Sequence, residues 1–373
     1  MDLSAIVLGA GRIGVSIAYA LSKYLKVKRV GIVSNKKEEL EKAKRIVGKG
    51  LETFEIDVMS KKVIDVVKDY DVVVGALPGS IGTRSFEVCI QAHKNLVDVS
   101  DLDYVEYKKF GKLAKKKGIS FIPEAGFSPG LSNLLVGYEY SNVDRVEEVC
   151  IKAGTLPKKG EKVFPVTWCF SDLVTSQRIK PTIVKNYKKI NLNPFSGYTK
   201  EKLPELGEVE SFYIENLSTL PMTINPRNMS YRVLRPLGFR FFFEYLDSYG
   251  FLEDKEAEID GNKINLFKLV EKVLTFKEVD NYTVLFIDFK GRKGKRTYVS
   301  KWQAMSFSKK REKFNSMQKI VSASTSLFVK ILVDGYTKPG INLTETLGRE
   351  ENIKTLKTIF KKSGIKIRRS ALS

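Results

Sequence analysis

The chain has 373 residues, of which 43% are hydrophobic and 29% are charged, and its formal net charge is +21. This composition is typical of a folded globular protein, and the length is too great for one hydrophobic core, so we expect two domains. No apolar run reaches the roughly 18 to 20 residues of a membrane-spanning helix, and the first residues lack a signal peptide's features. We therefore expect a cytoplasmic protein that does not contact a membrane.

The positive charge has two interpretations. Lysines are spread along the whole chain and often stand beside glutamates, as in residues 35–42, a pattern that favours a solvated charged surface. The alternative is a nucleic-acid partner. Its best local candidate is residues 290–296, where glycines between basic residues indicate a hairpin turn instead.

A metal centre is not expected. The cysteines Cys89, Cys150 and Cys169 form no C-x-x-C pair, and His93 is the single histidine. A Cys/His zinc site would need ligands that this chain lacks.

Strands and helices alternate through the first third of the chain. Buried strands are predicted at residues 5–8, 28–33, 53–57, 71–76, 95–99 and 120–123. Helices are predicted between them at residues 12–24, 36–47, 63–67, 83–92 and 104–117. The alternation predicts an α/β fold that begins with a Rossmann domain, a doubly wound parallel sheet, over residues 1–124.

The composition changes at residues 124–130, where glycine and proline cluster and we expect a hinge. Beyond it, alternating apolar segments predict a second α/β domain on a mixed sheet, residues 125–312. Strands are predicted there at residues 282–289 and 296–299, and helices follow at residues 317–333 and 352–363. If residues 166–168 form a strand, Asp172 beyond it faces the cleft. We expect residues 313–373 to return to the first domain.

The first motif that carries chemistry is the glycine loop after the first strand. It contains Gly9, Gly11, Arg12, Ile13 and Gly14 in a G-x-G-x-x-G spacing that opens a helix. In this context the glycines permit a tight turn, close approach of a pyrophosphate and close helix packing, and the helix N-terminus favours the phosphates. The loop predicts a bound dinucleotide.

The end of the second strand bears on the choice between NADP and NAD. An NAD enzyme places Asp or Glu there to bind the ribose hydroxyls, whereas this chain has Ser34, Asn35 and Lys36, followed by Lys37. We therefore predict that the cofactor is NADP in preference to NAD. The alternative is that the lysines simply begin a solvated helix.

The nicotinamide half of the cofactor is predicted to lie at the end of the fourth strand. Residues 75–79 have the sequence Gly-Ala-Leu-Pro-Gly, and small residues there let a dinucleotide lie over the backbone. We predict cofactor contacts from Ala76, Leu77 and Pro78, the alternative being an ordinary strand-to-helix turn.

Three segments together carry a family resemblance. Residues 75–79, 97–100 and 125–133 resemble the saccharopine dehydrogenase superfamily, and the closest similarity is to the lysine 6-dehydrogenases. In the second half, residues 166–168 with Asp172, residues 193–196 and residues 234–239 resemble the family's landmarks. The resemblance implies NAD(P)-dependent oxidation of an amine carbon, or the reverse reduction, by a homodimer.

Such chemistry needs a group that accepts a proton and a cation that holds a carboxylate. Candidates for the first role stand at the carboxyl end of the fifth strand and in the second domain: Asp98, Asp101 and Asp172. Candidates for binding the substrate are Glu124, Arg232 and, as the best carboxylate anchor, Arg235. A structural ion pair or helix cap remains the alternative for each.

The chain departs from the family pattern at substrate-facing positions. Phe239 stands where lysine 6-dehydrogenases usually carry a histidine, Ser218 where an arginine is common, and Ser128 where the saccharopine reductases carry an aspartate. The resemblance thus implies a kept cofactor site and an altered substrate.

We predict an NADP-preferring oxidoreductase that acts on the C–N bond of an amino acid such as lysine or saccharopine. Two alternatives stay open. One is a dinucleotide-binding or redox-sensing module without turnover, and the other is a basic Rossmann protein that also binds nucleic acid.

Overall fold

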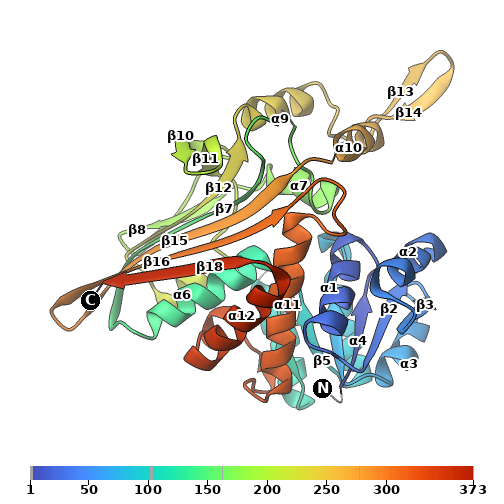
Figure 1. Cartoon of the computed structure of the whole chain (residues 1–373), viewed down its shortest axis with the longest axis horizontal. Coiled ribbons are helices and arrows are strands. Elements are labelled where there is room, and N and C mark those ends of the chain that lie inside the picture. Colours follow the sequence, from blue (N-terminus) through green and yellow to red (C-terminus); the bar gives the residue numbers. More distant parts are fainter. Residues whose placement is uncertain (1–2, 101–103, 162, 277, 373) are drawn as a thin grey trace.

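A computed structural model describes residues 3–100, 104–161, 163–276 and 278–372. It contains a parallel sheet covered by helices and a larger mixed sheet, with further helices between the two (Figure 1). This architecture confirms the predicted α/β fold, with a Rossmann domain followed by a second domain on a mixed sheet. No helix among the described residues is long and apolar enough to cross a membrane.

The first sheet has seven strands in the order β17-β6-β5-β4-β1-β2-β3. Its strands in chain order are β1 (Ser4–Leu8), β2 (Arg29–Ser34), β3 (Leu51–Glu55), β4 (Val72–Gly75), β5 (Asn95–Asp98), β6 (Ser120–Ile122) and β17 (Gly340–Ile341). Its helices are α1 (Arg12–Lys23), α2 (Lys37–Val47), α3 (Lys62–Lys68), α4 (Thr83–Ala92) and α5 (Tyr104–Lys116). Every pairing in this sheet is parallel, and the inner strands are buried and apolar because helices cover both faces.

The second sheet follows the path β10-β11-β12-β7-β15-β16-β18, with β8 and β9 attached beside β12. Its strands are β7 (Arg145–Pro157), β8 (Thr182–Lys185), β9 (Lys188–Asn191), β10 (Ser196–Leu203), β11 (Gly207–Tyr213), β12 (Asn228–Pro236), β15 (Asn281–Lys293), β16 (Arg296–Ser308) and β18 (Lys366–Leu372). A separate hairpin pairs β13 (Glu256–Ile259) with β14 (Asn262–Asn265).

The remaining helices connect or cover the sheets. They are α6 (Ser132–Tyr140), α7 (Phe170–Ser176), α8 (Leu220–Ile224), α9 (Phe239–Ser248), α10 (Leu266–Phe276), α11 (Ser316–Val333) and α12 (Glu350–Ser363), with short turns at Gly79–Ile81, Phe127–Leu131 and Thr344–Leu347. Helix α11 is buried along almost its whole length and packs on α1, β15 and β16. One apolar core therefore runs from the Rossmann helices through α11 to the second sheet.

The C-terminal segment is divided between the two sheets. Strand β17 pairs in parallel with β6 and becomes the outer strand of the Rossmann sheet, whereas β18 pairs antiparallel with β16 in the second sheet. The sequence predicted neither strand, because two-residue and exposed edge strands leave little periodicity. The expectation that residues 313–373 return to the first domain therefore does not hold for β18.

Two further predictions need correction. Residues 166–168, whose formation of a strand was the condition for Asp172 to face the cleft, are irregular, because their polar backbone groups bond to side chains from elsewhere in the chain. The hairpin predicted at residues 282–299 is real but longer: β15 and β16 each have 13 residues. A strong apolar alternation marked only the middle of these strands.

Candidate active site

The glycine loop is shaped to receive a phosphate group. A Cβ atom on Gly14 would lie 1.9 Å from the carbonyl oxygen of Gly9, and one on Gly9 would lie 2.6 Å from that of Ala76, so both positions require glycine. A Cβ on Gly11 would meet nothing within 4 Å. The first turn of α1 has neither a side-chain cap nor an acidic residue. Its free N–H groups and the open space above Gly11 fit the pyrophosphate of a dinucleotide.

Arg12 and Ile13 have different surroundings. The Arg12 guanidinium is exposed and donates a hydrogen bond of 3.0 Å to the carbonyl oxygen of Val166. The backbone oxygen of Arg12 accepts a 2.8 Å bond from Gln318 on α11. Ile13 packs against the core. The predicted phosphate loop is thus fastened to the irregular segment around residue 166 and to α11.

A carboxylate that was not predicted from the sequence lies at the end of β2. Ser34 is buried, and its hydroxyl donates to a carboxylate oxygen of Glu39 at 2.8 Å. The other oxygen of Glu39 lies 3.3 Å from the ammonium of Lys36, while Asn35 is exposed. Because α2 begins at residue 37, its first turn brings Glu39 back to the strand end. Glu39 therefore shares the predicted ribose site with Ser34, Asn35 and Lys36.

The loop after β4 faces the second domain. Ala76 is bonded to Leu8 by its N–H at 2.9 Å, Leu77 is partly buried, and Pro78 is exposed. A Cβ placed on Gly79 would lie 3.7 Å from a carboxylate oxygen of Asp172. Asp172, in the first turn of α7, has no hydrogen bond or ion pair with another described side chain. A carboxylate of the second domain, without a partner among the described side chains, therefore lies next to the predicted nicotinamide loop.

Asp98 lies behind this loop. It is fully buried, and a Cβ on Gly75 would lie only 1.7 Å from one of its oxygens. Its other oxygen accepts the Ser100 N–H at 2.7 Å. Burial raises the pKa of Asp98 to about 6, although hydrogen bonding to Ser100 and Ser85 acts in the opposite direction. A substrate cannot touch this carboxylate, so the predicted catalytic role of Asp98 does not fit its placement. Asp101 lies outside the described residues.

Glu124 belongs to a polar network under the hinge. It is buried and accepts hydrogen bonds from the Tyr107 hydroxyl, at 3.2 Å, and from the Ser218 hydroxyl. Asn133 in turn approaches Ser218 at 3.4 Å. Ser218 therefore connects Glu124 to the polar pocket beyond the hinge, which Ser218 also lines.

A small pocket lies beyond the hinge, and it brings together polar side chains from distant parts of the chain. Ser128 and Ser132, which are hydrogen-bonded at 2.9 Å, line it together with Asn133, Ser218 and Tyr231. Burial raises the pKa of the Tyr231 hydroxyl, so it stays protonated at neutral pH. Tyr231 was not predicted from the sequence, although its two-residue spacing from Val233 and Arg235 on one strand was available as a signal.

The two candidate arginines lie on opposite faces of β12. Arg235, three residues from Arg232, is 5% exposed and lies on the same face as Tyr231. Its guanidinium packs against Trp168 and Phe239 and donates one hydrogen bond of 3.2 Å, to the carbonyl oxygen of Leu234. No described carboxylate is within ion-pair distance of it. Burial lowers its pKa to about 10, with Glu215 opposing the change, so it stays charged at pH 7.

Arg232 is committed to the sheet itself. It donates to the hydroxyls of Ser211, at 3.0 Å, and Thr199, at 2.9 Å, and to the carbonyl oxygen of Gly197, and it stacks on Tyr213. These bonds use most of the N–H donors of Arg232, and they lie on the face of β12 opposite to Arg235. The predicted substrate-binding role of Arg232 therefore does not fit the structure.

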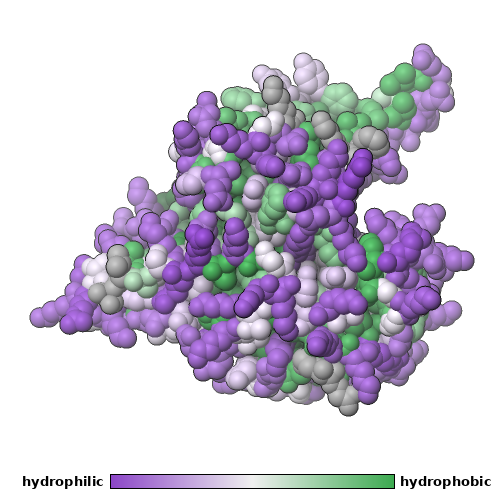
Figure 2. Space-filling model, in the orientation of Figure 1, coloured by the Kyte–Doolittle hydropathy of each residue, from purple (hydrophilic) through white to green (hydrophobic). Residues whose placement is uncertain are grey.

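A larger cavity, of about 410 Å³, lies beside the phosphate loop. Its walls come from Gly11 and Arg12, from α2, from the segment around residue 166 and from residues 308–315 after β16. Figure 2 shows the molecule hollowed between the Rossmann domain and the overhanging part of the second domain, with mostly hydrophilic residues around the hollow. Among the described residues, no group of His, Cys, Asp and Glu is arranged to hold a metal ion.

Comparison with known proteins identifies the same two parts of the chain. Residues 5–122 match the saccharopine dehydrogenase NADP-binding domain, and residues 126–365 match the saccharopine dehydrogenase C-terminal domain. An apo saccharopine dehydrogenase (L-Glu forming) from Saccharomyces cerevisiae superposes with a TM-score of 0.79 at 15% identity, covering 100% of both chains. The homospermidine synthase of Legionella pneumophila, solved with NAD, gives 0.70 at 14% identity, covering 100% of this chain and 92% of that one.

The two solved structures establish the common fold, and the family matches together span almost the whole chain. The residues that match the NADP-binding domain include the glycine loop. This match supports a nicotinamide dinucleotide as the cofactor of an oxidoreductase. The chain belongs to the saccharopine dehydrogenase family.

Proposed function

We propose that this protein is an NADP-preferring oxidoreductase that acts on the C–N bond of an amino acid bearing a free carboxylate. The observation that carries the proposal is the buried guanidinium of Arg235, which has one backbone hydrogen bond and no carboxylate partner among the described residues. A buried cation is costly unless it is paired. A carboxylate of the substrate would supply the missing partner, through two charge-assisted hydrogen bonds.

The chain's own groups suit the rest of the reaction. A bound nicotinamide would accept a hydride from the substrate carbon, or return one in reduction. In the oxidation direction the substrate nitrogen must also lose a proton, and Asp172 has a free carboxylate near Gly79 to accept it. Tyr231, protonated at neutral pH, and the hydroxyl of Ser128 would hold the polar end of the substrate by hydrogen bonds.

The substrate class follows from the same charges. The Legionella neighbour is named for homospermidine, a polyamine without a carboxylate. A polyamine would leave Arg235 unpaired and would bring further positive charge next to it, which favours an amino acid over a polyamine for this chain. Lysine and saccharopine are the first candidates. Ser128 and Ser218 stand in place of the family's charged residues, which favours a substrate whose polar groups near these two serines differ from those of lysine and saccharopine.

The NADP preference rests on charge near the ribose. Lys36 and Lys37 follow β2 and no Asp or Glu ends the strand, but Glu39 lies beside Ser34 and partly neutralises Lys36. The preference therefore depends on further cations that reach a 2′-phosphate.

The test is absorbance at the nicotinamide band with purified protein, NADP⁺ or NAD⁺, and a panel of lysine, saccharopine, related amino acids and polyamines. We expect reduced cofactor with at least one carboxylate-bearing amine, a lower KM for NADP⁺ than for NAD⁺, and no turnover of polyamines. Binding of NADP⁺ without turnover of any substrate would instead favour a dinucleotide-binding module. A lower KM for NAD⁺ would overturn the cofactor preference.

A further inference from the structure

The segment between β16 and α11 is the most basic part of the nucleotide-side cavity. Residues 309–313 have the sequence Lys-Lys-Arg-Glu-Lys and are all exposed. They come from the end of the second sheet, yet they line the same cavity as Gly11 and Arg12 of the phosphate loop. Nothing in the Rossmann motif predicts this contribution.

The cavity wall has an excess of positive charge. Its cationic residues are Arg12, Lys42, Lys309, Lys310, Arg311 and Lys313, and its acidic residues are Glu39, Glu278 and Glu312. Two of the acids are already paired with cations that are not in the wall, Glu39 with Lys36 and Glu312 with Lys319. The side chains of Lys42, Lys309, Lys310 and Arg311 have no ion pair with a described residue. The cavity therefore suits an anion.

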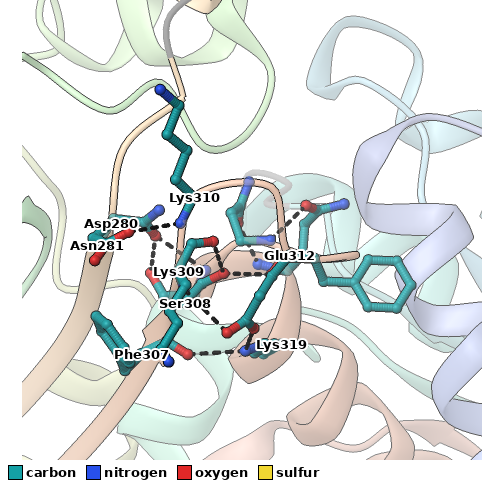
Figure 3. A network of polar contacts seen from close by, with 12 residues as sticks. Asp280, Asn281, Phe307, Ser308, Lys309, Lys310, Glu312 and Lys319 are labelled. Carbon is teal, nitrogen blue, oxygen red and sulfur yellow. Dashed lines mark hydrogen bonds and ion pairs between the residues drawn. The ribbon is translucent and has the colours of Figure 1, made fainter.

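The backbone of the segment is held in place before any ligand binds. Figure 3 shows that the N–H of Lys310 donates to Asp280 at 2.7 Å and the N–H of Lys309 to Glu312 at 3.2 Å. The Ser308 hydroxyl donates to the carbonyl oxygen of Phe314 at 2.7 Å. The side chain of Lys310 extends away from this network. The network therefore fixes the segment through its backbone, and the ammonium groups of Lys309 and Lys310 take no part in it.

Two other features connect the segment to nucleotide binding. Lys313 donates to the carbonyl oxygen of Ile46 at 3.4 Å, at the end of α2, and lies over the ring of Tyr19 on α1 at 4.8 Å. These contacts fasten the segment to the Rossmann domain. Arg311 has a φ of 64°, a left-handed conformation that an arginine adopts only with strain. Such strain is typical of functional positions.

We propose that residues 309–313 form a cross-domain phosphate clamp, in which Lys309, Lys310 and Arg311 act with Arg12 and Lys42 on the phosphate groups of the adenosine half of the cofactor. The inference rests on nucleotide binding by the proposed oxidoreductase. It adds that the second domain, and not the Rossmann domain alone, supplies the positive charge that holds the cofactor. Nucleotide binding then couples the two domains.

The test is calorimetric titration of the full chain with NADP⁺, NAD⁺, 2′,5′-ADP and ADP. The clamp variant combines Lys309→Ala, Lys310→Ala and Arg311→Gly. The matched control removes the same number of positive charges at the opposite end of β16, by Lys293→Ala, Lys295→Ala and Arg296→Ala, all of them exposed. Lys310→Glu alone serves as a second variant, because its backbone contact with Asp280 is unaffected. Thermal melting checks that each variant folds.

We expect the clamp variant to raise the Kd about 10-fold or more, because charge-assisted contacts to phosphate are lost, and the control to change it little. Loss confined to NADP⁺ and 2′,5′-ADP assigns the clamp to the 2′-phosphate. Equal loss for ADP and NAD⁺ assigns it to the diphosphate. Unchanged affinity in the clamp variant, or an equal loss in the control, overturns the clamp but leaves the proposed function standing. If the unaltered chain binds none of the four nucleotides, both fail.

Discussion

Replacing Arg235 by methionine tests whether this arginine binds the substrate or only stabilises the fold. Burial lowers the pKa of Arg235 from 12.5 to about 10. That difference corresponds to about 3 kcal/mol by which burial disfavours the charged form. Methionine fills much of the same space beside Trp168 and Phe239 without a charge. We therefore expect Arg235→Met to leave the free energy of unfolding unchanged or to raise it by about 1 to 3 kcal/mol at pH 7.

The same variant should bind substrate poorly. Loss of a charge-assisted pair of hydrogen bonds, worth about 1.5 to 3 kcal/mol, raises the KM of a carboxylate-bearing substrate about 10- to 150-fold, and the Kd of the cofactor stays the same. Arg232→Met is the matched control. It leaves the acceptors on Ser211, Thr199 and Gly197 without their donor, so we expect a loss of about 1 kcal/mol of stability and an unchanged KM.

The assays are denaturant unfolding and initial rates at varied substrate concentration. A strongly destabilised Arg235→Met protein with an unchanged KM would show that Arg235 is structural and would remove the main support for a carboxylate-bearing substrate.

Three further predictions follow from the site. Gly11→Val should abolish dinucleotide binding without unfolding the protein, because the new side chain enters the space that a phosphate would occupy; titration with NADP⁺ tests this, and retained affinity would refute the role of the loop. Asp172→Asn should lower kcat about 100-fold or more, with unchanged cofactor affinity; a kcat close to that of the unaltered chain would exclude Asp172 as the proton acceptor. Asp98 is protonated more readily in the folded than in the unfolded chain, so its contribution makes stability fall as the pH rises from about 4 to about 6. Asp98→Asn should remove that pH dependence and stabilise the protein above pH 6 by up to about 3 kcal/mol, as measured by urea unfolding at pH 5 and pH 8; a loss of stability at pH 8 would contradict this.

The shape of the glycine loop was largely predictable because its determinants are local. Gly9, Gly11 and Gly14 lie within one strand–turn–helix unit, so their spacing along the chain already places them in one tight turn. Ser34 and Lys36 lie at the end of β2 and Ala76 follows β4, and these two parallel strands flank β1, so their carboxyl ends lie at the same edge of the sheet. Glu39 was missed because a helical turn, and not a strand end, returns it to that edge.

The candidate catalytic and substrate groups were predicted less well because position after a strand does not give the direction of a side chain. Asp98 is the last residue of β5, and its fully buried carboxylate packs behind Gly75. Arg232 and Arg235 are both on β12, and the alternation of side chains sends them to opposite faces. Asp172 approaches the predicted nicotinamide loop from the first turn of α7, although residues 166–168 before it do not form a strand.

The sequence by itself determined the fold class, the family and the phosphate loop, because contiguous residues and their periodicity encode these. Only the tertiary structure brought Ser128, Ser218 and Tyr231 into one pocket, and only it placed residues 309–313 against the phosphate loop some 300 residues earlier in the chain. Such contacts depend on strand register and on packing through the buried helix α11, and no local pattern in the chain specifies either of them.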